Sequence, residues 1–191
     1  MRKKLKKRIF VISAPSGTGK TTIGKILRTK IPGLELTISC TTRKPRPGEK
    51  NGIDYHFISV SRFRKMAENK KFAEWAEVYG NYYGTPEEEI RVKLHRGCKV
   101  LLTVDTQGGM NIKKLFPSAV LIGILPPSLR EQEKRIKNRG KLTEKEFKKR
   151  MDAARKERQI LVNNYDFRLI NKNIETTIRK IQNIITKGKK Y

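Results

Sequence analysis

The sequence predicts an α/β fold with a parallel sheet core, an inserted, mainly β subdomain and a helical lid. Short apolar runs typical of strands alternate with helical segments along most of the chain, which indicates parallel strands joined by crossover helices. Two segments interrupt this alternation: residues 37–85 combine a Pro/Gly-rich stretch with short β-like runs, and residues 127–163 are helical and rich in Lys and Arg. A chain of 191 residues fits a single domain, residues 1–191, that carries both insertions.

The predicted core consists of residues 8–36, 86–126 and 164–191. Its strands, each with the helix that follows it, are Ile9–Ser13 and Lys20–Lys30, Val100–Asp105 and Met110–Leu115, Ala119–Leu125 and Leu129–Arg139, and Phe167–Ile170 and Ile174–Lys187. Within the first insertion, the predicted strands are Tyr55–Ile58, Ala73–Val78 and Asn81–Gly84.

Local signals at helix ends support these boundaries. A hydroxyl residue followed by Glu three positions later is the capping-box pattern, and it occurs at Thr85, Ser128 and Thr143. Gly97 and Gly140 stand where helices are expected to end, because glycine readily adopts the left-handed conformation that stops a helix.

Composition narrows the class of protein. The formal net charge of +27 would suit nucleic acid, because clustered Lys and Arg bind phosphate groups. Two short basic tails, at residues 2–8 and 187–190, leave such binding open as an alternative. The other cations are spread along the chain without a recognition-helix or RNA-binding signature, so we favour a solvated surface that attracts anionic nucleotides.

The apolar stretches are too short for a membrane-spanning helix, which needs ~20 residues. The basic N-terminus leads, after a short apolar run, into a glycine-rich loop and not into a secretory cleavage site. Cys40 and Cys98 form no Cys-x-x-Cys pair and no metal-ligand pattern, so we expect two reduced thiols. These features predict a cytoplasmic protein.

The strongest chemical signal is a P-loop between the first predicted strand and the first predicted helix. It consists of Ala14, Pro15, Ser16, Gly17, Thr18, Gly19, Lys20 and Thr21, with Thr22 after it. The glycines let backbone amides turn toward phosphates, Lys20 can reach the β and γ oxygens of ATP, and the Thr21 hydroxyl can hold Mg²⁺. Ala14 replaces the usual glycine by the next smallest residue. We therefore expect a P-loop three-layer fold that binds ATP.

Two further strings of residues narrow the function. The first is Thr-Thr-Arg-Lys-Pro-Arg-Pro-Gly-Glu at residues 41–49, and the second is Gly-Asn-Tyr-Tyr-Gly-Thr at residues 80–85. With the P-loop, they make the chain resemble the guanylate kinase family from about Ile9 to Asn171. The resemblance implies that the chain transfers the γ-phosphoryl group of ATP to GMP with Mg²⁺, and that residues 37–85 form the GMP-binding subdomain.

The resemblance also implies individual roles. The residues implied to hold the GMP phosphate are Arg43, Arg46, Tyr55 and Tyr83, and those implied to read the guanine are Ser39, Glu74 and Thr85. The chemistry agrees, because arginines and phenolic hydroxyls suit a phosphate dianion. The two acceptor oxygens of a glutamate match the N1–H and 2-amino donors of guanine, whereas adenine presents no such pair of donors.

A third candidate site lies at the end of the predicted strand 100–105, whose last residue carries a carboxylate. Asp105 is the candidate for the Mg²⁺ site, together with Thr21, and for a contact with GMP. Guanylate kinases usually carry two acidic residues here, spaced by one, whereas this chain has Thr103 at the first position. Weaker metal or GMP binding and a purely structural replacement both stay open as interpretations of Thr103.

The predicted lid contributes Arg135 and Arg139, one helical turn apart, and Arg150 in the next helix. By resemblance these arginines clamp the transferring phosphoryl group, so the implied catalytic residues are Lys20, Arg43, Arg135, Arg139 and Arg150. Asn171 falls where the family places an asparagine near the adenine, although Lys172 follows it instead of the usual Asp.

Two related proteins are the alternatives to an active GMP kinase. A guanylate-kinase-like scaffold domain would bind partner proteins without catalysis, and a ribose bisphosphate kinase would share only the P-loop core. The intact Lys20 and Thr21 argue against the first alternative, and the two strings at residues 41–49 and 80–85 argue against the second.

Overall fold

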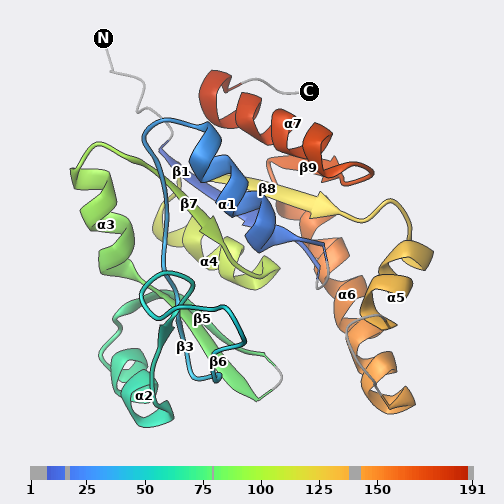
Figure 1. Cartoon of the computed structure of the whole chain (residues 1–191), viewed down its shortest axis with the longest axis horizontal. Helices are drawn as coiled ribbons and strands as arrows, with labels where there is room; N and C mark the ends of the chain where they lie inside the picture. The colour runs from blue at the N-terminus through green and yellow to red at the C-terminus, as the bar shows by residue number, and fades with distance from the viewer. Residues whose placement is uncertain (1–7, 16–17, 79, 138–142, 189–191) are drawn as a thin grey trace.

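The computed structural model describes residues 8–15, 18–78, 80–137 and 143–188, and its centre is a five-stranded parallel sheet (Figure 1). The strands follow the order β2-β7-β1-β8-β9. Their bounds are Ile9–Ser13 for β1, Leu34–Leu36 for β2, Lys99–Thr103 for β7, Val120–Leu125 for β8 and Phe167–Ile170 for β9. The predicted parallel core is confirmed.

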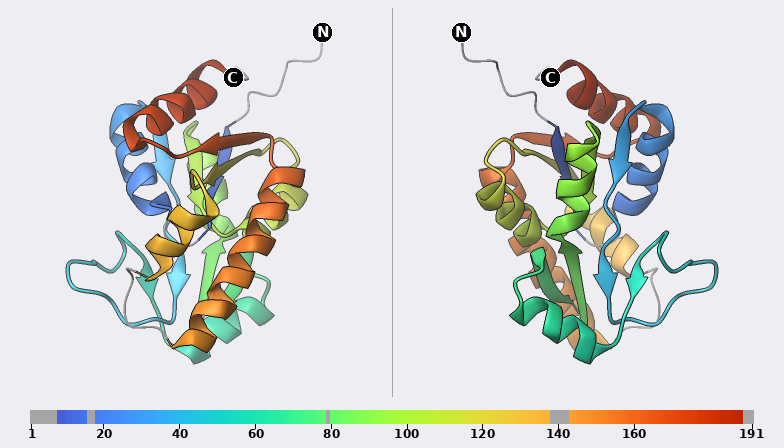
Figure 2. Two further views of the ribbon diagram at one scale, coloured as in Figure 1. Left: turned by 90° about the vertical axis from the view of Figure 1, so that its right-hand side faces the viewer. Right: turned by 90° about the vertical axis from the view of Figure 1, so that its left-hand side faces the viewer.

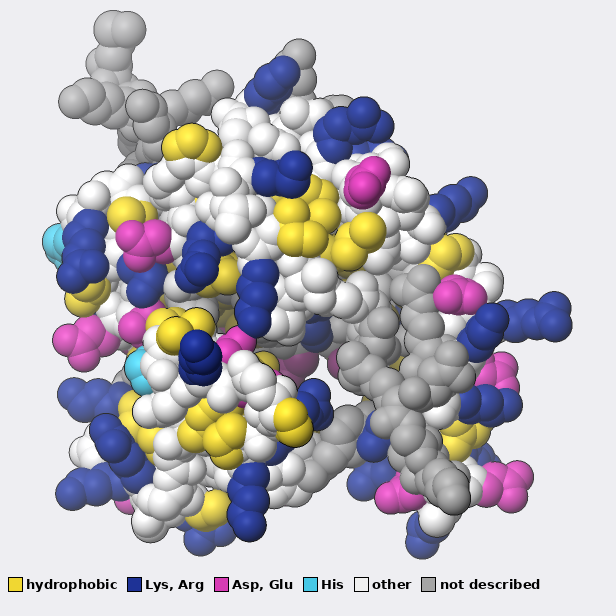
Figure 3. Space-filling model, viewed as in Figure 1, with side chains coloured by type: hydrophobic (Ala, Val, Ile, Leu, Met, Phe, Trp, Pro, Cys, Tyr) yellow, Lys and Arg dark blue, Asp and Glu magenta, His cyan; other side chains and the backbone are white. Residues whose placement is uncertain are grey.

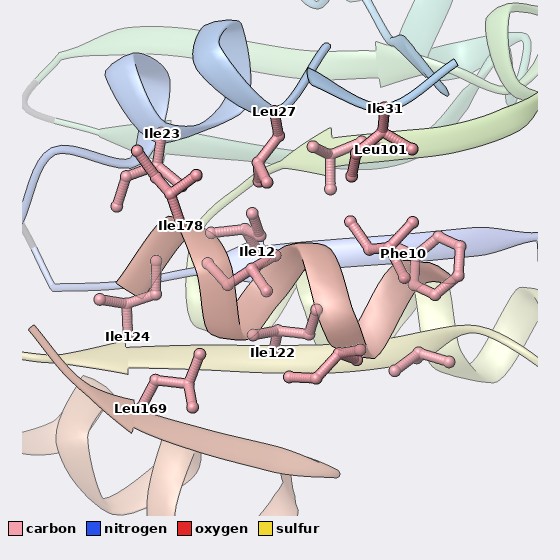
Figure 4. Close-up of a cluster of buried hydrophobic side chains, with 14 of the residues drawn as sticks. Phe10, Ile12, Ile23, Leu27, Ile31, Leu101, Ile122, Ile124, Leu169 and Ile178 are labelled. Carbon is pink, nitrogen blue, oxygen red and sulfur yellow. The ribbon is translucent and has the colours of Figure 1, made fainter. Parts of the chain in front are cut away.

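Helices cover both faces of this sheet, which gives three layers. Residues of α1 (Lys20–Lys30) and α7 (Ile174–Lys187) pack on one face, and residues of α3 (Glu87–His95), α4 (Thr106–Leu115) and α6 (Glu144–Asn164) pack on the other. Successive β1 residues alternate between the two layers, so that Phe10 and Ile12 face α1 and α7 (Figure 4). Burial on both faces explains why β1, apart from Ser13, and β8 carry no polar side chain.

The insertion forms a second, four-stranded sheet in the order β4-β3-β6-β5. Its elements are β3 (Cys40–Thr41), β4 (His56–Phe57), α2 (Val60–Glu68), β5 (Phe72–Val78) and β6 (Asn81–Pro86). Phe63 of α2 stacks on Phe72 and on Tyr82, with ring centroids 4.5 and 5.3 Å away. The insertion therefore has a small aromatic core of its own.

The predicted lid, residues 127–163, contains α5 (Leu129–Lys137) and most of the long helix α6. In Figure 1 these two helices project below the core on one side, and the insertion projects on the other. Figure 2 shows the same arrangement from two sides. Lys and Arg side chains are scattered over core, insertion and lid on the face in Figure 3. Within the described ranges, no helix has the length and apolarity of a membrane span.

Some predicted local features were wrong. The strands β2 and β3 and the helix α2 were not predicted, because the first two are very short and α2 lies in a segment interpreted as mainly β. Thr85 does not cap α3, whose N-cap is Pro86. Its hydroxyl instead bonds to Glu74 across the β5–β6 pair. Trp75 of β5 is 47% exposed, although its ring contacts Phe63 edge-on.

Other helix ends were predicted correctly. Thr143 and Glu146 form a complete capping box at the start of α6. At the start of α5, the backbone N–H of Glu131 donates to the Ser128 hydroxyl over 3.1 Å. Gly97 follows α3 with a φ of 82°, which is the left-handed conformation expected there. Gly140 lies outside the described residues.

Candidate active site

A cleft of about 380 Å³ lies between the P-loop, the insertion and α6. Its walls gather residues from distant parts of the sequence, which include Pro15, Thr18, Gly19, Lys20, Thr21 and Thr22 at the P-loop, Ser39, Arg43, Arg46, Tyr55, Glu74 and Tyr83 of the insertion, Thr103 and Asp105 at the carboxyl end of β7, and Arg150 of α6. The structure thus brings most of the predicted site residues to one place.

The P-loop connects β1 to α1 at this cleft. Gly19 adopts a φ of 84°, which a residue with a side chain rarely tolerates, and α1 starts at the next residue. The Lys20 ammonium group donates to the Ala14 carbonyl over 2.8 Å, which holds the lysine across the loop. The N-terminus of α1 adds partial positive charge, so this wall favours an anion. Ser16 and Gly17 lie outside the described residues.

Glu74 is the buried polar centre of the opposite wall, with an exposure of 7%. Its Oε1 accepts hydrogen bonds from the Thr85 backbone N–H at 3.0 Å and from the Thr85 hydroxyl at 2.6 Å. The Ser39 and Thr85 hydroxyls lie 3.0 Å apart. Burial, which outweighs the bonds from Thr85, raises the pKa of the Glu74 carboxyl from 4.5 to about 7. Three predicted guanine readers therefore form one hydrogen-bonded group.

The other carboxylate oxygen of Glu74 lies against the first turn of α4. A Cβ atom at Gly108 would stand only 2.6 Å from Glu74 Oε2, so any other residue at this position would displace the Glu74 carboxylate. Asp105 caps the same helix, because its Oδ1 accepts from the Gly108 backbone N–H at 2.6 Å. The negative charge of Asp105 also contributes to the raised pKa of Glu74. Gly108 was not singled out from the sequence, since only the tertiary contact reveals its role.

Arg43 is held in place by Glu49, which sequence reasoning did not identify as part of the site. Two guanidinium nitrogens donate to the two Glu49 carboxylate oxygens, each over 2.9 Å. Arg46 contributes its backbone N–H to Glu49 Oε2 at 2.8 Å. The ion pair raises the pKa of Arg43 and lowers that of Glu49. The Arg43 guanidinium also lies 5.5 Å from the centre of the Tyr55 ring.

Thr103 and Asp105 stand at the carboxyl end of β7, beside the P-loop wall. The Thr103 methyl group packs against α1, where a Cβ on Gly24 would approach it to 3.0 Å. Thr21 and Asp105 offer one hydroxyl and one carboxylate to the cleft. No cluster of three or more His, Cys, Asp or Glu suited to a metal ion occurs in the part of the chain that the structure describes. Mg²⁺ bound mainly by phosphates and water needs no such cluster, so this donor set fits it.

Comparison with known proteins identifies the family. The family model described as guanylate kinase matches residues 6–188. The chain belongs to the guanylate kinase family. Guanylate kinase from Clostridioides difficile is 42% identical over 95% of this chain and 88% of its own, and guanylate kinase from Caldanaerobacter subterraneus subsp. tengcongensis is 45% identical over 93% and 85%. The crystal structure of guanylate kinase from Anaplasma phagocytophilum matches with a TM-score of 0.77 at 30% identity, over 96% of this chain and 86% of that one.

The remaining predicted residues of this guanylate kinase family member differ in their position relative to the cleft. Arg150 lines the cleft from α6, on the same helix face as Ala153 and Glu157. Arg135 belongs to α5, but its side chain, like all of Arg139, lies outside what the structure describes. Asn171 is 7% exposed and does not line the cleft, since its side chain lies behind the P-loop.

Proposed function

We propose that this member of the guanylate kinase family transfers the γ-phosphoryl group of ATP to the phosphate of GMP, forming ADP and GDP. The observation that carries the proposal is the shared cleft. A P-loop suited to a triphosphate forms one wall, and a buried glutamate with hydroxyl neighbours forms the other. The two substrates would therefore meet between these walls.

The acceptor wall is suited to GMP at both of its ends. Ser39, Glu74 and Thr85 would read the guanine, with the ionised Glu74 accepting the N1–H and 2-amino hydrogens. A buried site built for such bonds discriminates strongly, because a base without the donors leaves the carboxylate unpaired. Arg43, Arg46, Tyr55 and Tyr83, which all line the cleft, would hold the phosphate.

The donor wall would hold ATP through the P-loop amides and Lys20. Thr21 and Asp105 would hold Mg²⁺, which, when bound, neutralises charge on the transferring phosphoryl group. Asp105 is proposed for both roles, metal binding and contact with GMP. Its capping bond to Gly108 fixes the orientation of the carboxylate at the junction of the two walls.

Catalysis would rest on position and charge. The GMP phosphate is already anionic and needs no strong base, so the chain must align it with the γ-phosphate and stabilise the developing charge. Lys20 and Arg43 would do this from the walls, and Arg150 from α6, joined by Arg135 and Arg139. Closure of the α5 and α6 segment over the cleft would exclude water from the reacting oxygens.

A coupled assay of ADP release tests the proposal directly. ATP and Mg²⁺ are supplied with GMP, AMP, UMP or CMP, and we expect kcat/KM for GMP to exceed the others by at least ~10²-fold. Equal turnover of GMP and AMP would contradict the acceptor assignment. Binding of GMP without any ADP release would indicate a non-catalytic guanylate-kinase-like domain instead.

A further inference from the structure

A chain of buried hydrogen bonds connects the last strand of the sheet to the back of the P-loop. Asn171 follows β9 directly, and its backbone N–H donates to the Leu125 carbonyl at 2.8 Å. The Asn171 side-chain amide nitrogen donates to the Thr18 carbonyl at 3.4 Å. Its amide oxygen lies 3.0 Å from the Thr177 hydroxyl of α7, which shares its one hydrogen between this oxygen and the Asn173 carbonyl, also 3.0 Å away. Thr18, Asn171 and Thr177 are 4%, 7% and 2% exposed.

The partners fix the orientation of this amide. The Thr18 carbonyl can only accept, so the amide nitrogen of Asn171 must face it, and the amide oxygen must face the Thr177 hydroxyl. Both ends of the side chain therefore have a partner within the protein. Turning this side chain away toward a base would leave a buried carbonyl of the P-loop without the bond from Asn171.

The geometry of a trans peptide transmits this contact to the phosphate side of the loop. The Thr18 carbonyl and the Gly19 N–H belong to one planar peptide unit and point in opposite directions. Asn171 holds the carbonyl from behind, and Gly19 lines the cleft in front. The Gly19 N–H is consequently directed away from Asn171, and amides presented by a glycine-rich loop are what bind phosphate oxygens.

We infer that Asn171, supported by Thr177, is a positioning residue that fixes the Thr18–Gly19 peptide for the phosphates of the donor nucleotide and does not select the adenine base. The inference rests on the proposed function only in taking the P-loop as the triphosphate site. It predicts that loss of Asn171 weakens every ligand bound through phosphates, whatever base the ligand carries.

Calorimetric titration of the full chain with Mg²⁺-ATP and with Mg²⁺-tripolyphosphate separates base from phosphate recognition, because tripolyphosphate has no base. For Asn171→Ala we expect Kd to rise about 3- to 10-fold for both ligands by the same factor, with the Kd of GMP unchanged. A weakened ATP complex with an unchanged tripolyphosphate complex would overturn the inference in favour of adenine recognition. Unchanged affinity for both, with only a lower melting temperature, would overturn it in favour of a purely structural role.

Thr177→Val keeps the shape of the side chain and removes the hydroxyl that orients Asn171, so it decides the question if Asn171→Ala does not fold. We expect a smaller rise of Kd, again equal for the two ligands, and unequal rises or none would count against the inference. Thr186→Val is the matched control, because its exposed hydroxyl donates to the carbonyl four residues earlier on the same helix, that of Gln182. Both ligands can be titrated without GMP turnover, so failure of the proposed acceptor would be seen separately in the ADP assay.

Discussion

The acceptor wall and the lid, formed by α5 and α6, differ in how firmly their charged groups are held. On the acceptor side, Glu74 is bonded to Thr85 within the β5–β6 pair, and Arg43 is paired with both oxygens of Glu49. On the lid side, α6 carries Arg150 on a helix of 21 residues in which only Ala154 and Leu161 are buried. The acceptor groups are thus part of a packed sheet, whereas the lid presents its charge on a sparsely anchored helix.

This difference indicates that the acceptor wall recognises the nucleotide and that the lid moves. Packing and hydrogen bonds prepare the acceptor wall before a nucleotide arrives, which suits recognition of a particular base. Few buried contacts leave a segment with low local stability, and such segments supply the moving parts of enzymes. We therefore expect changes on the acceptor wall to act mainly on KM for GMP, and changes on the lid to act mainly on kcat.

The largest effect is expected at Lys20, which would contact the phosphoryl group that passes between the two substrates. Lys20→Ala removes the ammonium group of the P-loop and should lower kcat by ~10²- to 10³-fold, because the charge on the transferring phosphoryl group loses its fixed cation. The fold should survive, since the lysine side chain is half-buried at the cleft and belongs to neither hydrophobic core cluster. Circular dichroism checks the fold, and near-normal turnover by a folded variant would refute the P-loop assignment.

Glu74→Gln tests the acceptor wall. Glutamine presents only one acceptor oxygen to guanine, so kcat/KM for GMP should fall about 5- to 150-fold, which corresponds to ~1–3 kcal/mol. The Kd of ATP should stay the same, because Glu74 lies on the opposite wall. Glu88→Gln, at an exposed position of α3, is the control for loss of a carboxylate. A parallel loss of ATP affinity would argue against the separation of the walls.

Arg150→Gln tests the lid. The guanidinium group of Arg150 is expected to act on the reacting phosphates after closure, so kcat should fall about 10-fold while KM for GMP changes little. Steady-state kinetics with both substrates varied distinguish the two constants. An increase of KM for GMP at unchanged kcat would place Arg150 in acceptor binding and remove the contrast between the acceptor wall and the lid.

The pH dependence of GMP binding sharpens the contrast further. Guanine donors need the ionised carboxylate, and the pKa of Glu74 is raised to about 7, so the Kd of GMP should rise about 10-fold between pH 8 and pH 6. The GMP phosphate itself has a second pKa near 6. Glu74→Gln is therefore measured as the reference, because its pH dependence reports the GMP phosphate alone. Any additional change of Kd with pH in the wild type is assigned to Glu74.

The raised pKa of Glu74 should also make the stability of the protein depend on pH, but stability should fall as pH rises, whereas GMP binding should strengthen. The folded state binds the Glu74 proton more tightly than the unfolded state, whose pKa is 4.5. Its contribution to the free energy of unfolding is therefore fully present below pH 4.5 and is lost as pH rises to about 7. The melting temperatures of the wild type and of Glu74→Gln should therefore diverge between pH 4.5 and pH 7. The same pH dependence in both proteins would contradict the raised pKa.

The smallest expected effect concerns the anchoring of the lid. Gln132 of α5 is 1% exposed, and neither its amide nitrogen nor its amide oxygen has a hydrogen-bond partner among the described residues. Gln132→Leu removes this desolvated amide and should stabilise the protein by about 1–2 kcal/mol, or roughly 2–6 °C in Tm. Gln159→Leu, at an exposed position of α6, should give no gain. A lower Tm for Gln132→Leu would show that the amide is satisfied.

Sequence reasoning succeeded where a pattern is local and strong. The buried strands β1 and β8 are short apolar runs between turn signals, and the P-loop joins β1 to α1 as expected. It was weaker in the insertion, where β3 has two residues and α2 has nine. Strands this short carry no period, and the aromatic contacts of Phe63 that hold α2 are formed only in three dimensions.

By itself, the sequence determined the layered core and the P-loop, because periodicity and glycine spacing are properties of neighbouring residues. The residues of the acceptor wall were expected from the resemblance to a family. Only the tertiary structure decided that Thr85 supports Glu74 instead of capping α3, that Glu49 holds Arg43, and that Asn171 faces the back of the P-loop. These outcomes depend on which buried polar groups find partners across distant segments. A buried donor or acceptor must be paired wherever the fold places it, and that placement is not encoded by any local pattern.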